Sequence, residues 1–194
     1  FPDSTFIEDN AVILEGCAWL TCMKETTRSG EPFLLKPVLE KYLPVRSLKP
    51  PAFLDGGDVL ATESALFVGQ SERTTSEACA VLQRELNTPV IPVPVYDQLH
   101  LKTVATYLGR QTLLVFKEGC DADLFSDFKL IEVSDEEAYA ANCLAIGDLV
   151  ILPAGFPRVK QDIENAGFQV LTVEMSEFEK ADGGLTCLSL IIPR

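Results

Sequence analysis

A single cysteine near the end of the chain lies in a sequence context that suits a reactive thiol. Cys187 follows the turn Asp182-Gly183-Gly184 and opens an apolar run that ends at Ile192. A thiol at the edge between a loop and a strand is held by rigid structure and is still within reach of a substrate. Because most free cysteines are simply small buried hydrophobes, Cys187 alone indicates a buried strand residue more readily than a nucleophile.

One histidine and several acidic turns supply the groups that a cysteine nucleophile needs. His100 is the only histidine of the chain, and an imidazole within hydrogen-bond reach of a thiol can shuttle its protons. Carboxylates gather at similar turns, namely at Asp3, Glu8, Asp9, Asp55 and Asp58. A cluster of carboxylates suits a planar cation that donates several in-plane hydrogen bonds, as a guanidinium does.

Two arginines follow the first two predicted hairpins. Arg28 comes after the first hairpin and Arg73 after the second, and either could hold a substrate carboxylate through two parallel hydrogen bonds. A ligand with a guanidinium at one end and a carboxylate at the other is an arginine derivative. Each feature alone has an ordinary explanation, as a turn carboxylate or a surface charge. Their combination indicates a site for an arginine-like molecule.

A weak internal repeat predicts how these residues are brought together. One polar residue precedes each of five apolar stretches, and the successive separations are 47, 45, 42 and 45 residues; the five are Glu8, Asp55, His100, Asn142 and Cys187. A period of this size is typical of repeated structural units. We therefore expect the units to close around a centre, where the five polar residues meet. The alternative is chance recurrence in a strand-rich α+β chain.

Each repeat has the pattern of strand, tight turn, strand, helix and strand. Helical spacing of apolar residues predicts helices over 29–42, 75–86 and 157–166, with Thr74 as a possible N-cap and Gly167 as a C-cap signal. Strands are expected over 168–173 and 185–192. The predicted fold class is thus α/β or α+β, built from ββαβ units.

Composition limits the functions that the chain can have. With 194 residues, 47% of them hydrophobic, it is long enough for one globular domain with its own core. A net charge of -13 argues against nucleic acid or an anionic membrane as a partner and favours a small cationic substrate. The six cysteines form no CxxC pair and only one histidine is present, which argues against structural zinc. Their scattered spacing favours a reducing cytoplasm.

Several motifs resemble those of the dimethylarginine dimethylaminohydrolase family, which belongs to the guanidino-group-modifying pentein superfamily. The matching segments run in the same order along the whole chain and include 1–9, 54–59, 67–74, 99–103, 140–143, 175–178 and 180–189. The resemblance implies a five-bladed α/β propeller of ββαβ units around a central active site. It also implies a single catalytic domain over 1–194 whose first and fifth units are incomplete here, because family members carry a further N-terminal segment.

The resemblance also implies roles for particular residues. Cys187 would be the nucleophile, His100 the general acid and base, and Asp55 the carboxylate that orients His100. Substrate would be bound by the following residues: Asp3, Glu8, Asp9, Arg28, Arg73, Ala181 and Asp182. The implied reaction converts Nω-methylated arginines to citrulline and dimethylamine or methylamine through a covalent thiouronium, without a metal or organic cofactor. A homodimer is left open.

Three alternatives remain at this stage. An arginine deiminase would run the same chemistry on arginine, but that group typically carries an aspartate where this chain has Lys102, and it is much longer. An amidinotransferase would pass the amidino group to an amine, and the sequence excludes it poorly. An inactive homologue would bind methylarginine without turnover, and retention of Cys187, His100 and Asp55 argues against it.

Overall fold

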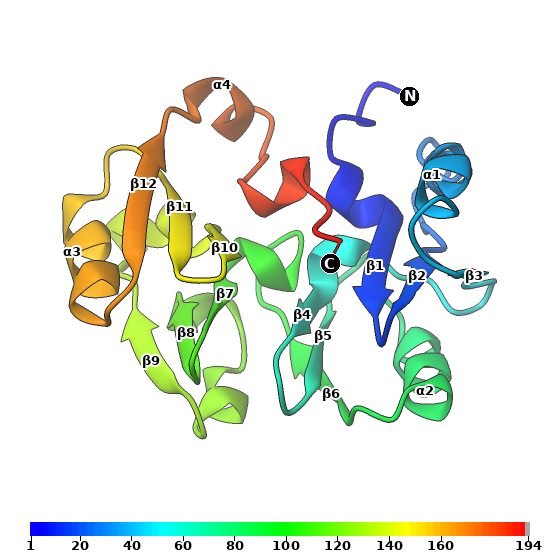
Figure 1. Ribbon diagram of the computed structural model, residues 1–194, viewed down its shortest axis with the longest axis horizontal. Helices are drawn as coiled ribbons and strands as arrows, with labels where there is room; N and C mark the ends of the chain where they lie inside the picture. The colour runs from blue at the N-terminus through cyan, green and yellow to red at the C-terminus, as the bar shows by residue number, and fades with distance from the viewer. Residues whose placement is uncertain (193–194) are drawn as a thin grey trace.

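Short strands form four three-stranded sheets around a common centre in this computed structural model, which describes residues 1–192 (Figure 1). In each sheet an antiparallel hairpin is followed by a connection and a third strand that returns parallel to the second. The strands are β1 (Ala11–Leu14), β2 (Cys17–Leu20) and β3 (Val45–Ser47); β4 (Val59–Ala61), β5 (Leu66–Gln70) and β6 (Val90–Pro94); β7 (Ala105–Gly109), β8 (Thr112–Val115) and β9 (Lys129–Glu132); and β10 (Leu144–Ile146), β11 (Leu149–Pro153) and β12 (Gln169–Val173).

Two of the hairpins close with tight turns that have left-handed backbone. Glu15 and Gly16 have φ of 47° and 72° between β1 and β2, and Arg110 and Gln111 have φ of 52° and 56° between β7 and β8. Two consecutive residues with positive φ match the right-handed twist of the flanking strands. These two turns thus fix the register of their hairpins, and with it the face of the sheet on which each side chain lies.

Three of the four connections contain the predicted helix. The helices are α1 (Glu31–Leu39), α2 (Ser76–Glu85) and α3 (Pro157–Asn165), all within the ranges expected from the sequence. The N-cap of α2 is Thr75 rather than Thr74, because Thr74 instead donates its hydroxyl to Asp58. Gly167, with φ of 93°, follows α3 as expected. Among residues 1–192, no helix has the length and apolar character needed to cross a bilayer.

The third connection differs from the others. Two 3-10 turns, η4 (Lys117–Gly119) and η5 (Ala122–Phe125), take the place of an α-helix between β8 and β9. Phe125 from η5 is fully buried and packs edge-on against Phe67 at a centroid distance of 4.9 Å. One large aromatic side chain therefore covers the sheet where a helix face does so elsewhere.

The first and last turns of the described chain, Ile7–Asn10 and Thr186–Leu188, are in contact. The predicted strand over 185–192 is wrong: Thr186–Leu188 forms the 3-10 turn η7, and residues 189–192 form no strand. The reason is that the Thr186 amide and hydroxyl are bound by Asn142 and Glu8 and cannot join a strand ladder. The short helix α4 (Ser176–Glu179) precedes this segment. Figure 1 shows the C-terminal segment in red between β10 and β1.

Candidate active site

A short turn precedes each of the four sheets and a fifth lies near the end of the described chain, and each turn contains or directly adjoins one of the five repeated polar residues. The turns are η1 (Ile7–Asn10), η2 (Gly56–Asp58), η3 (Leu101–Thr103), η6 (Asp135–Ala141) and η7. Neighbouring turns touch in the order η6, η3, η2, η1 and η7, and Asn142 then hydrogen-bonds to Thr186 in η7 to complete the ring. The expectation that Glu8, Asp55, His100, Asn142 and Cys187 meet at one centre is met by this arrangement.

His100 lies between two buried carboxylates. Its Nε2 is 3.1 Å from Asp55 Oδ2 and 3.9 Å from Asp9 Oδ1, and all three side chains are almost completely buried. Burial alone would lower the pKa of His100, but the hydrogen bond to Asp55 and the charges of Asp9 and Asp58 outweigh it and raise the pKa to about 9. The imidazole therefore carries a proton at neutral pH.

Glycine at position 57 lets the histidine and the carboxylate approach closely. A Cβ on Gly57 would lie 2.7 Å from His100 Nδ1 and 2.9 Å from Asp9 Oδ1, so no side chain fits there. The Gly57 amide instead donates to Asp9 Oδ1 at 3.0 Å. The Asp-Gly-Gly turn is thus needed for space as well as for backbone freedom.

A second aspartate in this turn holds the histidine segment in place. Asp58 Oδ1 accepts the Leu101 amide at 2.9 Å, next to His100, while Oδ2 accepts hydroxyls from Ser71 and Thr74 at 2.6 Å. Asp58 is completely buried, and burial raises its pKa. Its oxygens are occupied, so it positions His100 rather than facing a ligand.

Asp55 keeps one oxygen free. Asp55 Oδ1 is buried and has no hydrogen-bond partner among the described residues, whereas Oδ2 is bound to His100. A buried carboxylate oxygen without a donor is costly unless a ligand or water supplies one. This atom is therefore a natural acceptor for an N–H of a bound cation.

The Cys187 thiol is partly buried at the edge of a cavity. The Gly184 amide donates to its Sγ at 3.3 Å. Burial, and then the charge of Glu8, raise the pKa of Cys187 to about 11, although the Gly184 amide opposes the shift. At neutral pH the resting thiol is thus protonated.

Glu8 is engaged by the protein itself. Its two oxygens bind Lys102 Nζ at 2.5 Å and the Thr186 hydroxyl at 2.7 Å, and the side chain is buried. Burial raises the pKa of Glu8, while the charge of Lys102 opposes that shift. In the structure Glu8 links three of the central turns instead of presenting a free carboxylate.

Arg28 is also held internally. Its Nε and Nη2 donate to Glu31, Nη1 donates to Asp9 Oδ2 at 2.8 Å, and Nη2 reaches the Phe6 carbonyl at 3.1 Å. The side chain is 7% exposed. We expected Arg28 to bind a substrate carboxylate. In this structure its guanidinium donors are instead bound to partners within the chain. Glu31, which sequence reasoning missed, could have been noticed from its position three residues after Arg28.

The other predicted binding residues lie nearer the surface. Arg73 is 27% exposed at its side chain, with Nη1 3.9 Å from Asp55 Oδ2. Asp3 is exposed, and its backbone carbonyl rather than its carboxylate contacts Arg28. Ala181 and Asp182 are exposed in the turn that precedes Gly183, and Asp182 has a positive φ of 56°.

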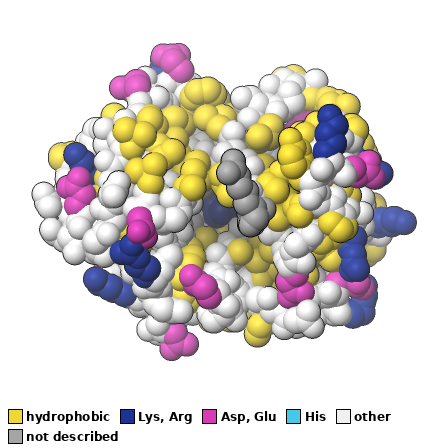
Figure 2. Space-filling view, viewed as in Figure 1, with side chains coloured by type: hydrophobic (Ala, Val, Ile, Leu, Met, Phe, Trp, Pro, Cys, Tyr) yellow, Lys and Arg dark blue, Asp and Glu magenta, His cyan; other side chains and the backbone are white. Residues whose placement is uncertain are grey.

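Three adjoining cavities run across the molecule from the thiol to Arg73. Cys187, Asp182 and Leu99 line the first, of about 470 Å³. Leu99 also lines the second, of about 570 Å³, which shares Glu72 with a third of about 520 Å³ beside Arg73. A separate cavity of about 250 Å³ is lined by the inner strands, Glu8 and Lys102, and the face in Figure 2 is hollowed at its centre.

The buried carboxylates and imidazole could also act together as ligands. Asp9, Asp55 and His100 each offer one atom, and these atoms lie within 4.8 Å of one another. Two carboxylates and one imidazole would suit a divalent cation, and the same carboxylates suit a guanidinium.

Comparisons with known proteins identify relatives over nearly the whole chain. N(G),N(G)-dimethylarginine dimethylaminohydrolase of Pseudomonas aeruginosa is 35% identical over 98% of this chain and 77% of its own length. The enzyme of the same name from Streptomyces coelicolor is 30% identical over 97% of this chain and 74% of its own length. No family model matches the chain.

A solved structure of the P. aeruginosa protein shares the fold. That structure is a cysteine-to-serine variant in complex with citrulline; it superposes with a TM-score of 0.91 at 32% identity, over 97% of this chain and 76% of that one. The ββαβ units and their central ring are therefore those of the pentein fold, as the sequence predicted. On the identity and coverage of these relatives, the chain belongs to the dimethylarginine dimethylaminohydrolase family.

Proposed function

We propose that this chain hydrolyses Nω-methylated arginines to citrulline and the corresponding methylamine, with Cys187 as nucleophile and His100 as general acid and base. The observation that carries the proposal is the meeting of a protonated imidazole, two buried carboxylates and a partly exposed thiol at one ring of turns. Family membership supports the same activity. Residues 1–194 then act as one catalytic domain.

The substrate guanidinium is placed against Asp55 and Asp9. Asp55 Oδ1 lacks a donor, and a guanidinium N–H supplies one in the plane of the cation. The adjoining cavities give the amino-acid part of the substrate a path toward Arg73 and Lys24. Arg73 is the better candidate for the substrate carboxylate, since Arg28 is held by Glu31 and Asp9.

Substrate binding activates the thiol. Cys187 has a pKa raised to about 11 by burial and by Glu8. A guanidinium brings a positive charge beside the sulfur, and a nearby opposite charge favours the thiolate. The Gly184 amide stabilises that thiolate further. The enzyme thus forms its nucleophile when the substrate is in place, and the thiol proton is released to solvent.

The reaction proceeds in two balanced steps. The Cys187 thiolate adds to the guanidinium carbon; as that tetrahedral species collapses, the bond to the methylated nitrogen breaks and the protonated His100 imidazole gives a proton to the departing amine. Water then adds to the thiouronium carbon while His100 takes a proton from it. The carbon–sulfur bond breaks, the added hydroxyl loses its remaining proton to solvent, and citrulline and the free thiolate result. The carboxylates stabilise the cationic states by charge.

Turnover of two substrates in parallel tests this proposal. Purified protein is incubated with asymmetric dimethylarginine and with arginine, and citrulline, dimethylamine and ammonia are measured. We expect citrulline and dimethylamine from the first substrate and little ammonia from the second. Ammonia from arginine would instead identify a deiminase, and the absence of product from both would contradict the proposed activity.

Two cysteine variants separate an enzyme from a binding protein. Cys187→Ser should abolish turnover yet retain binding of dimethylarginine, measured by calorimetry. Cys17→Ser, which changes another partly exposed cysteine, should keep turnover within about twofold of wild type. Equal activity of wild type and Cys187→Ser would rule out the covalent route.

The cellular setting that we propose is the reducing cytoplasm. All six cysteines are free thiols in the structure, and a reactive thiolate is preserved best where disulfides do not form. A small methylated arginine is the proposed partner, without nucleic acid or membrane, and light scattering tests whether two copies of the chain form a homodimer.

A further inference from the structure

We propose that Asn142 is the positioning residue for the nucleophile: it holds the loop 184–187 so that a backbone amide points at the Cys187 sulfur. The inference deepens the proposed hydrolysis and rests on it for the role of Cys187. Asn142 begins the fourth repeat as Glu8, Asp55 and His100 begin theirs, yet it is outside the set of reacting groups.

Asn142 makes three hydrogen bonds that join separate parts of the ring. Its Oδ1 accepts the Thr186 amide at 3.0 Å, and its Nδ2 donates to the Lys102 carbonyl at 3.0 Å and to the Thr186 hydroxyl at 3.1 Å. The residue is 4% exposed. A buried amide with donors and acceptor all satisfied has one orientation. Thr186, the residue before the nucleophile, is therefore fixed at both its backbone and its side chain.

The same side chain sets the position of Gly184. A Cβ on Gly184 would lie only 2.3 to 2.6 Å from the amide atoms of Asn142, so the two are packed face to face. The Gly184 amide is the donor to Cys187 Sγ at 3.3 Å, and it opposes the rise in the pKa of that thiol. Asn142 thus holds both the residue that precedes Cys187 and the donor that stabilises its thiolate.

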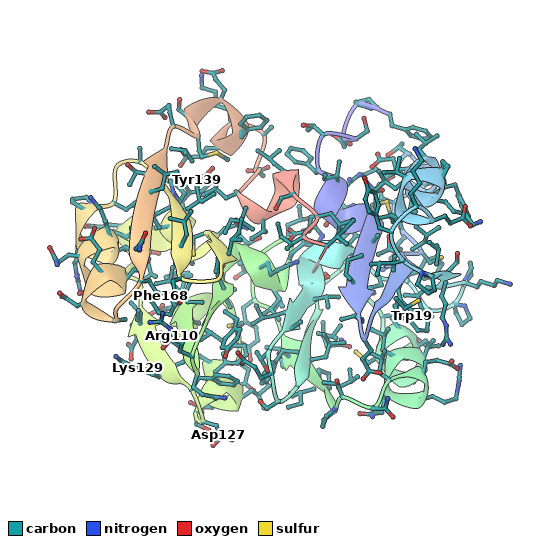
Figure 3. The ribbon with its side chains drawn as sticks, in the orientation of Figure 1. Trp19, Arg110, Asp127, Lys129, Tyr139 and Phe168 are labelled. Carbon is teal, nitrogen blue, oxygen red and sulfur yellow. The ribbon has the colours of Figure 1, made fainter. Side chains whose placement is uncertain are left out.

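A neighbouring tyrosine anchors the start of the loop. The Tyr139 hydroxyl donates to the Gly183 carbonyl at 2.8 Å. Tyr139 comes from η6, which ends at Ala141, directly before Asn142. Figure 3 labels Tyr139 between α4 and the strands β10 to β12, on the side of the molecule that faces the C-terminal turn. One turn of chain therefore supplies both anchors of the nucleophile loop.

Loss of these anchors should slow chemistry more than it weakens binding. A displacement of about 1 Å at a reacting atom costs on the order of 10²-fold in rate. The guanidinium site at Asp55 and Asp9 is held by other contacts, to His100, Gly57 and Arg28. For Asn142→Ala we expect kcat to fall about 100-fold while KM changes less than about threefold.

Alkylation of the thiol tests the inference without turnover. Full-length protein is treated with iodoacetamide between pH 7.5 and 9.5, and modification of Cys187 is followed by peptide mass spectrometry. Below its pKa, the rate follows the thiolate fraction. Without the Gly184 donor in place, Asn142→Ala should react about three- to tenfold more slowly than wild type at each pH.

A second variant covers the case in which alanine impairs folding. Asn142→Asp has the same shape and still accepts the Thr186 amide, but it loses both donors and adds a negative charge near the sulfur. Like Asn142→Ala, this variant should be alkylated at Cys187 more slowly than wild type. Unchanged or faster alkylation in the folded variants, or a kcat equal to that of wild type, would overturn the inference.

Thr106→Val is the matched control. The Thr106 hydroxyl donates to the Ala141 carbonyl and also lies close to the Cys143 carbonyl, so it bonds to the same segment on either side of Asn142. It should lower the melting temperature without changing Cys187 alkylation. An equal loss of alkylation in Thr106→Val would mean general loosening and would overturn the positioning role. If wild type lacks turnover on methylarginine, the proposed function fails while the alkylation result still decides the role of Asn142.

Discussion

The single imidazole of this protein is held charged against the effect of its own burial. His100 has its pKa raised to about 9, because the hydrogen bond to Asp55 and the charges of Asp9 and Asp58 outweigh desolvation. The histidine then enters the reaction as an acid, which is the form that the departing amine requires.

Removing the partner of this histidine should therefore lower its pKa. In Asp55→Asn the strongest raising contact is lost while burial remains, and we expect the pKa of His100 to fall by about one to two units. Because the chain has one histidine, NMR titration of the imidazole reports it without ambiguity. A pKa equal to that of wild type would show that Asp55 does not hold the proton.

The same shift predicts how stability depends on pH. The pKa of His100 is about 9 in the folded protein and 6.5 in the reference state. Its stabilising contribution is thus complete below pH 6.5 and is lost as pH rises through about 9. In urea unfolding, wild type should lose more stability than His100→Asn between these two pH values. Parallel pH profiles would contradict the coupling.

The sequence indicated which residues belong to the site better than it indicated which residues they contact. Cys187, His100 and Asp55 came from motifs, and the structure brings the histidine and aspartate into contact. The partners of Glu8 could not be read from the sequence, because Lys102 and Thr186 reach it from distant turns. Because those contacts are not visible in the sequence, the carboxylate of Glu8 was expected to be available to the substrate.

Helix α1 contributes to the site through a buried ion pair rather than through a substrate contact. Glu31 is 2% exposed and accepts two donors of Arg28, which in turn binds Asp9. Removing one partner of a buried pair leaves an uncompensated charge and is strongly destabilising. The first turn of the helix is thus tied to the central carboxylates.

This pair gives a prediction with a control at the C-terminal end of the same helix. Glu31→Gln should lower the free energy of unfolding by about 3 kcal/mol, measured by urea denaturation. Glu40→Gln removes the exposed pair with Lys36, where both side chains are nearly half exposed, and should cost under about 0.5 kcal/mol. Similar losses of unfolding free energy in the two variants would show that the buried Arg28–Glu31 pair stabilises the fold no more than an exposed pair does.

The sequence predicted the ends of a helix or strand correctly where those ends depend on neighbouring residues alone. The helix over 157–166 and its glycine stop agree with α3 and Gly167. The apolar run from Leu185 predicted a strand, but contacts from Asn142 and Glu8 fold its start into η7. A periodic pattern carries no information about hydrogen bonds offered by other parts of the chain.

For the whole molecule, the recurrence of one polar residue per unit was the signal that predicted the ring. Spacing alone placed five residues at one centre, and the connected turns of the structure reproduce that arrangement. The absence of an α-helix from the third unit could not be predicted in the same way. There Phe125, from a 3-10 turn, packs against Phe67 of the neighbouring sheet and takes the place of a helix.

The net charge of -13 should make substrate capture dependent on salt. A methylarginine carries one net positive charge, so the acidic field raises its concentration at the site. Raising the salt concentration from about 20 mM to roughly 0.5 M shortens the Debye length to a few ångströms, and kcat/KM should fall about three- to tenfold with kcat unchanged. Citrulline has no net charge, so its inhibition constant should stay nearly constant over the same range. If kcat fell in parallel, or if citrulline weakened equally, salt would be acting on the folded structure rather than on attraction of the cation.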